Sequence, residues 1–334
     1  MARPRWTRTI IALGGTLFLG ALVALSPEAK GSGYADAVTG TPSYLPLAMK
    51  QPTPTPGAWG RIVFESSRDG LGNIFEIYSM KADGRDVKRL TYLGQYSRDA
   101  SWSPDYGRIV FDSGPRYDDA LRELWVMNAD GTGLQRLTNN SVYDWDPSWS
   151  PDGTSIAFTS GPIGKADIWL MDTSTWVAVK LTDWSGADLD PCWSPDSAYI
   201  AFTSDRYGSN YNIYRMNRYG GEVLRLTDDP ADDTDPSWSS DGTRIAFESN
   251  RGSRSEIWVM NAYGSPPTNL SNWPGLDLDP SWLVGAERIV FNADRVPHDD
   301  DMEVYIMNSD GTGQTRLTYA TGTDGDACAR PGCP

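Results

Sequence analysis

Apolar and polar residues alternate in short segments along this chain, and the pattern recurs at intervals of 44 to 47 residues. Segments such as 155–160 (SIAFTS) and 256–261 (EIWVMN) have the alternation of half-buried β-strands. One position of the pattern is always phenylalanine: Phe64, Phe111, Phe158, Phe202, Phe247 and Phe291. A fixed period of this length indicates six structural units of one kind, packed side by side.

Each unit contains four such segments. The first carries Asp-Pro-x-Trp-Ser, as at 146–150, and leads into a Pro-Asp-Gly turn that suits a hairpin. The second is rich in strand-forming residues, the third alternates, as in DIWLMD at 167–172, and the fourth is a short RLT, as at 136–138. No stretch beyond residue 60 keeps a helical period. We therefore predict an all-β, six-bladed β-propeller with four-stranded antiparallel blades.

The two ends of the repeat region complement each other. The first unit begins directly at 61–64 (RIVF), without an Asp-Pro-x-Trp segment before it. Residues 324–332 (DGDACARPG) align with 188–196 (DLDPCWSPD), although Ala327 and Ala329 replace Pro and Trp. We predict that this C-terminal strand completes the first blade and closes a ring over residues 59–334, which leaves no open sheet edge.

The N-terminal segment 1–37 has the pattern of a secretory signal. Arg3, Arg5 and Arg8 precede an uncharged run from 9 to 25, and 35–37 (ADA) offers a small-x-small cleavage site. The run is at the short limit for crossing a bilayer, so an uncleaved N-terminal anchor is the alternative. Both interpretations predict a protein that is secreted, periplasmic or on the cell surface.

Residues 38–58 are rich in proline and threonine and lack periodicity, which is typical of an extended tether. The chain as a whole has a net charge of −15 and no lysine/arginine-rich block. Nucleic-acid binding by phosphate neutralisation is therefore disfavoured, and a cationic or neutral partner suits the charge better. We expect a monomer, attached to a membrane only if the N-terminal segment is retained.

Three cysteines fit an oxidising compartment. Cys328 and Cys333 flank ARPG, a sequence able to turn, and a disulfide between them is predicted. Cys192 stands where sister repeats have serine, so we interpret it as a buried, unreactive thiol.

The phrases at 146–160 (DPSWSPDGTSIAFTS) and from 167 (DIWLMDTST, followed by KLT) resemble the TolB-type propeller repeat of secreted and periplasmic proteins, a relative of WD-repeat blades. The resemblance extends from residue 60 to about 330. It implies the propeller fold and, by similarity to TolB, a scaffold that contacts other envelope proteins. TolB has an α/β domain before its propeller; here the tether stands in that place, which argues against a role in the Tol system.

Pairs of aspartates open the first strand of most units. They are Asp144/Asp146, Asp188/Asp190, Asp233/Asp235, Asp277/Asp279 and Asp324/Asp326, with Ser97 and Asp99 in the second unit. Alternation predicts that each pair lies on one face of its strand, at one mouth of the central channel. Counting outward from the hairpin turn places Arg206, Arg251 and Arg295 opposite Asp188, Asp233 and Asp277. The favoured interpretation is structural ion pairing, incomplete in the third unit, whose loop has no arginine.

The alternative is a ligand-binding ring of these carboxylates at the channel mouth, which could hold a hard cation such as Ca²⁺. No compact calcium-loop motif supports it. The only histidine, His298, precedes Asp299, Asp300 and Asp301 in a loop at the same mouth; a metal-binding or catalytic role and an ordinary exposed loop both remain open.

Tryptophan occurs in two settings. Trp102, Trp149, Trp193, Trp238 and Trp282 recur at one repeat position and are expected to be packing residues. Trp145, Trp176, Trp184 and Trp273 lie outside that register, three of them (145, 184 and 273) in expected connections between blades. These could form an aromatic patch for sugar or peptide, or cap the gaps between blades.

No nucleophile elbow, zinc-protease motif or phosphate-binding loop occurs in the sequence. We therefore predict a non-enzymatic scaffold that binds an envelope or extracellular protein or a glycan. The alternative is a carbohydrate-active lyase or hydrolase that uses the channel-mouth carboxylates, although six similar copies fit a dedicated acid/base pair poorly.

Overall fold

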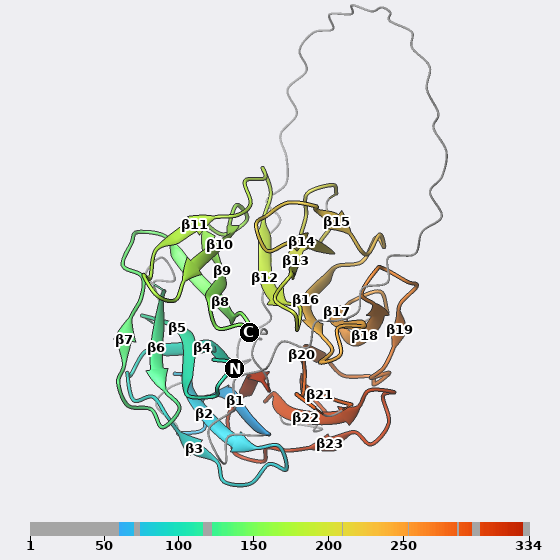
Figure 1. Cartoon of the computed structure of the whole chain (residues 1–334). Helices are drawn as coiled ribbons and strands as arrows, with labels where there is room; N and C mark the ends of the chain where they lie inside the picture. The colour runs from blue at the N-terminus through green and yellow to red at the C-terminus, as the bar shows by residue number, and fades with distance from the viewer. Residues whose placement is uncertain are drawn as a thin grey trace, which may run out of the picture. The chain divides into compact units, whose positions relative to one another are not determined.

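The computed structural model describes residues 60–69, 74–115, 122–208, 210–252, 254–285, 287–295 and 301–329. Within these ranges the protein is all-β and contains no helix, so no described segment has the length and apolar character of a membrane-crossing helix. Six four-stranded antiparallel sheets surround a common centre (Figure 1). The predicted six-bladed propeller is confirmed; the signal segment and the tether lie outside the described residues.

Each blade has one strand near the centre of the ring and three further strands outward (Figure 1). The first strands are β24 (Asp324–Cys328), β4 (Tyr96–Trp102), β8 (Tyr143–Trp149), β12 (Asp188–Trp193), β16 (Asp233–Trp238) and β20 (Asp277–Trp282). The second strands are β1 (Arg61–Ser66), β5 (Arg108–Gly114), β9 (Ser155–Gly161), β13 (Tyr199–Ser204), β17 (Arg244–Ser249) and β21 (Arg288–Ala293).

The third strands are β2 (Glu76–Lys81), β6 (Glu123–Asn128), β10 (Asp167–Asp172), β14 (Asn212–Asn217), β18 (Glu256–Asn261) and β22 (Glu303–Asn308). The fourth are β3 (Lys88–Arg89), β7 (Gln135–Arg136), β11 (Ala178–Lys180), β15 (Leu224–Arg225), β19 (Thr268–Asn269) and β23 (Thr315–Arg316). The fourth strands are short, as predicted.

A leucine followed by threonine, or by serine in blade 5, comes directly after each fourth strand and explains how so short a strand is held. The threonine hydroxyl accepts a hydrogen bond from the first apolar residue of the third strand, as from Ile77 N to Thr91 Oγ1 at 2.8 Å. Val304 N donates to Thr318 Oγ1 in the same way at 2.9 Å. The hydroxyl thus continues the sheet where the backbone ladder ends.

Packing between blades fills the interior. The recurring tryptophans of the first strands are buried, and Trp149 packs with Val110 of blade 2 and Phe158 of its own blade. Polar contacts add to this packing, because the Trp193 indole donates to the Ser148 carbonyl of the preceding blade at 3.1 Å. The expected packing role of these tryptophans is confirmed.

Ring closure occurs as predicted. β24 pairs with β1 in an antiparallel ladder, with Val63 opposite Cys328 and Ser66 opposite Asp324. Ala329 takes the place of the recurring tryptophan and still makes the equivalent backbone contact, because its N–H donates to Ser281 Oγ of blade 6 at 3.3 Å. Cys328 is buried; Cys333 lies outside the described residues, so the disulfide stays a prediction.

Deleting residues 321–334 should remove β24 and leave β1 as an open edge above an exposed core. We expect a loss of about 4 kcal/mol or more, which corresponds to a fall of about 10 °C in Tm, together with self-association through the edge. Circular dichroism melting and size-exclusion chromatography measure both. The matched control deletes only 330–334, beyond β24; an equal effect of the two deletions would contradict closure by this strand.

Candidate functional site

The candidate site is the end of the propeller where first strands begin and second strands end, called the mouth face below. Four blades bury an aspartate here with no side-chain exposure and pair it with an arginine from the loop after the second strand. The pairs are Asp324/Arg68 at 2.8 Å, Asp188/Arg206 at 2.8 Å, Asp233/Arg251 at 2.6 Å and Asp277/Arg295 at 2.7 Å. The three pairs predicted from the sequence are confirmed.

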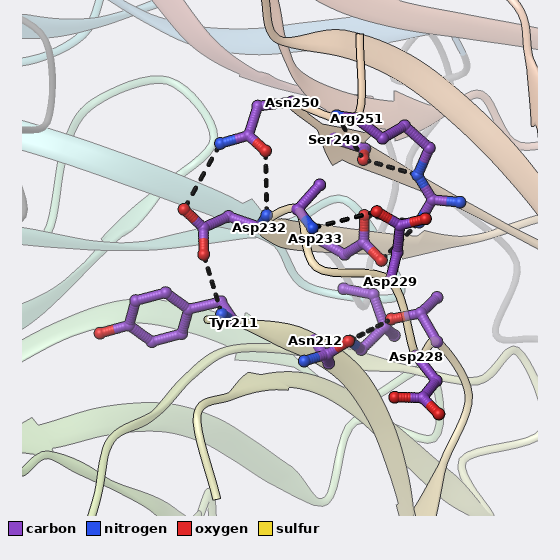
Figure 2. A network of polar contacts seen from close by, with 12 residues as sticks. Tyr211, Asn212, Asp228, Asp229, Asp232, Asp233, Ser249, Asn250 and Arg251 are labelled. Atoms are coloured by element: carbon purple, nitrogen blue, oxygen red, sulfur yellow. Dashed lines mark hydrogen bonds and ion pairs between the residues drawn. The ribbon is translucent and has the colours of Figure 1, made fainter. Parts of the chain in front are cut away.

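Figure 2 shows the blade 5 example, in which Arg251 also donates from Nε to Ser249 Oγ at 2.9 Å. Both oxygens of Asp233 accept from the guanidinium. Neighbouring Asp232 accepts from Tyr211 N of blade 4 at 2.9 Å, so the network joins two blades. Charge-assisted bonds of this kind offset the large cost of burying a carboxylate.

Each arginine also lies over two aromatic rings of its own blade. Arg206 lies 5.0 Å from the ring centre of Phe202 and 5.1 Å from that of Tyr214, and Arg251 relates similarly to Phe247 and Trp258. Arg68 and Arg295 repeat the arrangement. The recurring phenylalanine therefore forms part of a guanidinium slot bounded by one carboxylate and two rings.

Burial still affects these acids. Desolvation raises the pKa of Asp233, Asp277 and Asp324, while the paired arginines act in the opposite direction. These four buried aspartates, called the outer set below, are therefore structural residues, each paired with an arginine of its own blade. They are poorly placed to act on a ligand.

The second aspartate of each pair, together with Asp99 of blade 2, belongs to an inner set that has an unusual backbone conformation. Asp99, Asp146, Asp190, Asp235, Asp279 and Asp326 all have φ between 41° and 53°. Aspartate tolerates this left-handed conformation better than most residues. A register shift follows in each strand, as between Leu189 and Cys192. This bulge breaks the plain alternation from which a common face was predicted for each pair, and that prediction is wrong.

Two groups of three carboxylates arise from the inner set. Glu65 joins Asp99 and Asp326, and Glu248 joins Asp235 and Asp279, with oxygens within 4.8 Å of one another in each group. Both glutamates follow the recurring phenylalanine in the second strand. Sequence reasoning missed them, although a polar residue at that position of an apolar strand is a usable signal. Oxygen-only groups of this kind suit hard cations such as Ca²⁺.

The first group is partly compensated within the chain. Burial, and next the charge of Asp326, raise the pKa of Glu65 well above its usual range, and Arg98 opposes them from 3.6 Å. In blade 2, Arg122 donates to Asp112 at 2.7 Å and to Asp99 at 2.9 Å. Within the inner set, Asp146 and Asp190 belong to neither group.

Blades 2 and 3 depart from the outer pattern. In blade 2, Ser97 replaces the aspartate, and its hydroxyl lies 3.1 Å from that of Ser113. In blade 3, Asp144 is retained but its carboxylate accepts from the Asn140 amide at 2.7 Å, in place of an arginine. The incomplete compensation predicted for the third unit is confirmed.

Aromatic side chains are exposed on the connections between blades at the mouth face. Trp184 and Trp273 are 42% and 45% exposed, and Tyr92 and Tyr319 are more exposed still. Each lies beside an arginine: the guanidinium carbon of Arg295 is 5.1 Å from the ring centre of Trp273, and that of Arg89 is 4.4 Å from the ring centre of Tyr92.

The other two tryptophans outside the repeat register have different positions. Trp145 lies within β8, against Tyr143 at 5.5 Å, so its predicted place in a connection is wrong. Trp176 lies in the turn between β10 and β11 and packs near Trp149. His298 lies outside the described residues.

Residues 182–271 match the protein family PD40, described as the TolB β-propeller domain. The predicted resemblance to TolB-type propeller repeats is confirmed. No curated protein sequence matches the chain. The family match spans all strands of blades 4 and 5, and the same strand pattern continues through the other blades.

Solved structures with the same fold include TolB-type propellers and enzymes. TolB from Acinetobacter baumannii is 23% identical with a TM-score of 0.70, over 81% of this chain and 67% of that one. A TolB-assigned protein from Agrobacterium tumefaciens is 21% identical with a TM-score of 0.62, over 79% and 90%. Oligogalacturonate lyase from Vibrio parahaemolyticus is 13% identical with a TM-score of 0.54, over 77% and 74%. At these identities the likeness establishes the fold alone.

A third acidic layer at the mouth face pairs the start of the third strand with the fourth strand. Arg89 contacts Glu76 at 2.9 Å, Arg136 contacts Glu123 at 2.8 Å, and Arg316 contacts Glu303. Burial is the largest influence on Glu303, and it raises the pKa to about 7 despite the Thr318 hydroxyl and Arg316. Nearby Asp324 adds to the rise.

The stability of the propeller should therefore depend on pH through Glu303. Because the folded-state pKa is raised above the unfolded value of about 4.3, the contribution of the neutral acid is complete below that value and is lost as pH rises through about 7. Glu303→Gln mimics the neutral acid, so the variant should gain stability relative to the wild type between about pH 5 and pH 8. Tm measured across this range tests the expectation; a difference that does not change with pH would contradict it.

Proposed function

We propose that the protein is an extracytoplasmic, non-enzymatic scaffold that binds a cationic segment of a partner protein at the mouth face. The exposed aromatics of the mouth face carry this proposal. Trp184, Trp273, Tyr92 and Tyr319 surround an acidic centre, and such rings favour cations and flat ligand surfaces. The net charge of −15 favours the same class of partner.

The secretory pattern at 1–37 supports the extracytoplasmic location, which both the cleaved and the anchored forms would share. A glycan is the second ligand class, because exposed tryptophans such as Trp184 also stack on sugars. We favour a protein segment because the acidic centre adds charge complementarity that a neutral glycan would not use.

The condition of the carboxylates supports binding over catalysis. The outer aspartates are fully buried and paired with arginine in four blades, so they are occupied by structural partners. In the group of Glu248, Asp235 and Asp279 all three acids are half-buried, whereas acid/base catalysis needs two carboxyls with different environments. Glu248, Asp235 and Asp279 could instead hold Ca²⁺ and modulate the charge of the mouth face.

Isothermal titration of the full chain with a peptide rich in arginine and lysine tests the proposal, in calcium and in chelator. Saturable binding is expected, and the double variant Trp184→Ala/Trp273→Ala should weaken it by about 5- to 25-fold, since each exposed cation–π contact contributes about 0.5–1 kcal/mol. The acidic counterpart of the peptide should not bind.

Tyr219→Ala provides the matched control. Tyr219 is exposed, lies beside Arg218, and belongs to the turn between β14 and β15 at the opposite face, so binding should be unchanged. Equal weakening by the control, or no binding of the basic peptide, would contradict the proposed site. Turnover of oligogalacturonate that is lost in Glu248→Gln would replace the scaffold with the enzyme alternative.

A further inference from the structure

Blades 1, 4, 5 and 6 share a guanidinium slot, which consists of a buried first-strand aspartate, the repeat phenylalanine and the aromatic residue opposite it on the third strand. In each of these blades an arginine that stands two residues after the end of the second strand fills the slot. Arg251, for example, contacts Asp233 and lies 5.5 Å and 5.0 Å from the ring centres of Phe247 and Trp258.

Blade 2 has lost both members of the ion pair. Pro115 stands at the arginine position, two residues after Ser113, and Ser97 stands at the aspartate position. The two hydroxyls of Ser97 and Ser113 lie 3.1 Å apart, so neither an aspartate nor an arginine occupies these two positions. Loss of the cation together with the anion is the combination that electrostatics permits at low cost.

Blade 3 has lost only the cation. Pro162 stands two residues after Ser160, at the arginine position, while Asp144, Phe158 and Trp169 are all present. The loop 161–166 has the same length as 250–255 of blade 5, so the backbone could place an arginine here as it does there. Blade 3 therefore contains the carboxylate and both rings of the slot without the guanidinium.

The state of Asp144 indicates an unmet requirement for a cation. Its side chain is fully buried, and Oδ1 accepts no hydrogen bond from the described residues. No ion pair among the described residues includes it. The groups that hydrogen-bond to the Asp144 carboxylate, the Asn140 amide and the hydroxyls of Ser160 and Thr138, are all neutral. Burial raises the pKa of Asp144, and the negative charge of Glu123 acts in the same direction.

We propose that blade 3 accepts a guanidinium group in trans, supplied by an arginine of the binding partner, between Asp144 and the rings of Phe158 and Trp169. The inference rests on the proposed function, because the slot opens on the mouth face. It narrows the partner to a segment that presents an arginine, since only the planar guanidinium satisfies a carboxylate and stacks on rings together.

Access to the slot depends on the loop that covers it. Pro162, Ile163, Gly164 and Lys165 are exposed, and Ile163 is 73% exposed. A backbone hydrogen bond from Lys165 N to Pro162 O closes the loop as a turn. Trp169 is half-buried, as is Trp258 in the filled slot of blade 5. We expect an incoming arginine to displace the exposed residues of this loop and to leave the sheet intact.

Titration of the full chain with N-acetyl-arginine amide, followed by NMR of the tryptophan indoles, tests the slot. The uncharged isostere N-acetyl-citrulline amide is the control ligand. We expect a saturable shift of the Trp169 indole with arginine and not with citrulline. The Trp258 indole should not respond, because Arg251 already fills its slot.

The variant Pro162→Arg supplies the missing arginine in cis. It should raise Tm and weaken the arginine response at least about tenfold, as expected when a charge-assisted contact is already occupied. Asp144→Asn should also abolish the response and serves if Pro162→Arg fails to fold.

An equal response to arginine and citrulline, or a response that persists in both variants, would overturn the slot. These outcomes are separable from failure of the proposed function. Basic peptides that bind through Trp184 and Trp273 regardless of Pro162→Arg would leave the scaffold intact and remove only the slot. If the slot binds arginine but the chain binds no basic peptide, the slot would stand and the proposed scaffold function would be contradicted.

Discussion

The structure depends on how blades 1, 4, 5 and 6 bury a carboxylate at the mouth face. Burying a carboxylate without a cation is costly, so in these blades the loop after the second strand folds back and places a guanidinium against it. The arginine in turn needs the flat rings of Phe247 and Trp258, or their equivalents, to lie on. One ion pair thus connects the start of the first strand, the middle of the second and third strands, and the intervening loop.

The same kind of ion pair also contributes to ring closure, where it joins two segments from opposite ends of the repeat region. Arg68, which follows β1, forms an ion pair with Asp324 of the closing strand β24 at 2.8 Å. The closing strand lacks the tryptophan that other blades use for packing, and the much smaller Ala329 is buried in its place and keeps the backbone contact to Ser281. The ion pair and the β1/β24 ladder therefore hold the first blade together where apolar packing is reduced.

Much of this could be predicted from the sequence because the repeat makes one blade evidence for the others. The period gave the blade count, and mirror counting found the Asp233/Arg251 pair. The sequence could not reveal that Asp235 has a left-handed backbone conformation, because a bulge changes the register of a strand without changing its composition. Glu65 and Glu248 were missed for a related reason: the carboxylates of each group come from two blades and meet only when neighbouring blades pack together. Trp145 was misplaced because the first strand begins earlier than its Asp-Pro phrase suggests.

Deviations from the repeat mark where blades differ in chemistry, and Asp144 is the clearest of them. The most direct test of the central claim compares one substitution in two blades, Asp233→Asn and Asp144→Asn, by chemical denaturation at neutral pH. Asp233→Asn should destabilise the protein by about 3–5 kcal/mol because Arg251 loses its partner, whereas Asp144→Asn should be neutral or stabilising because it removes a buried charge that has no cation. Equal destabilisation by both variants would contradict the account.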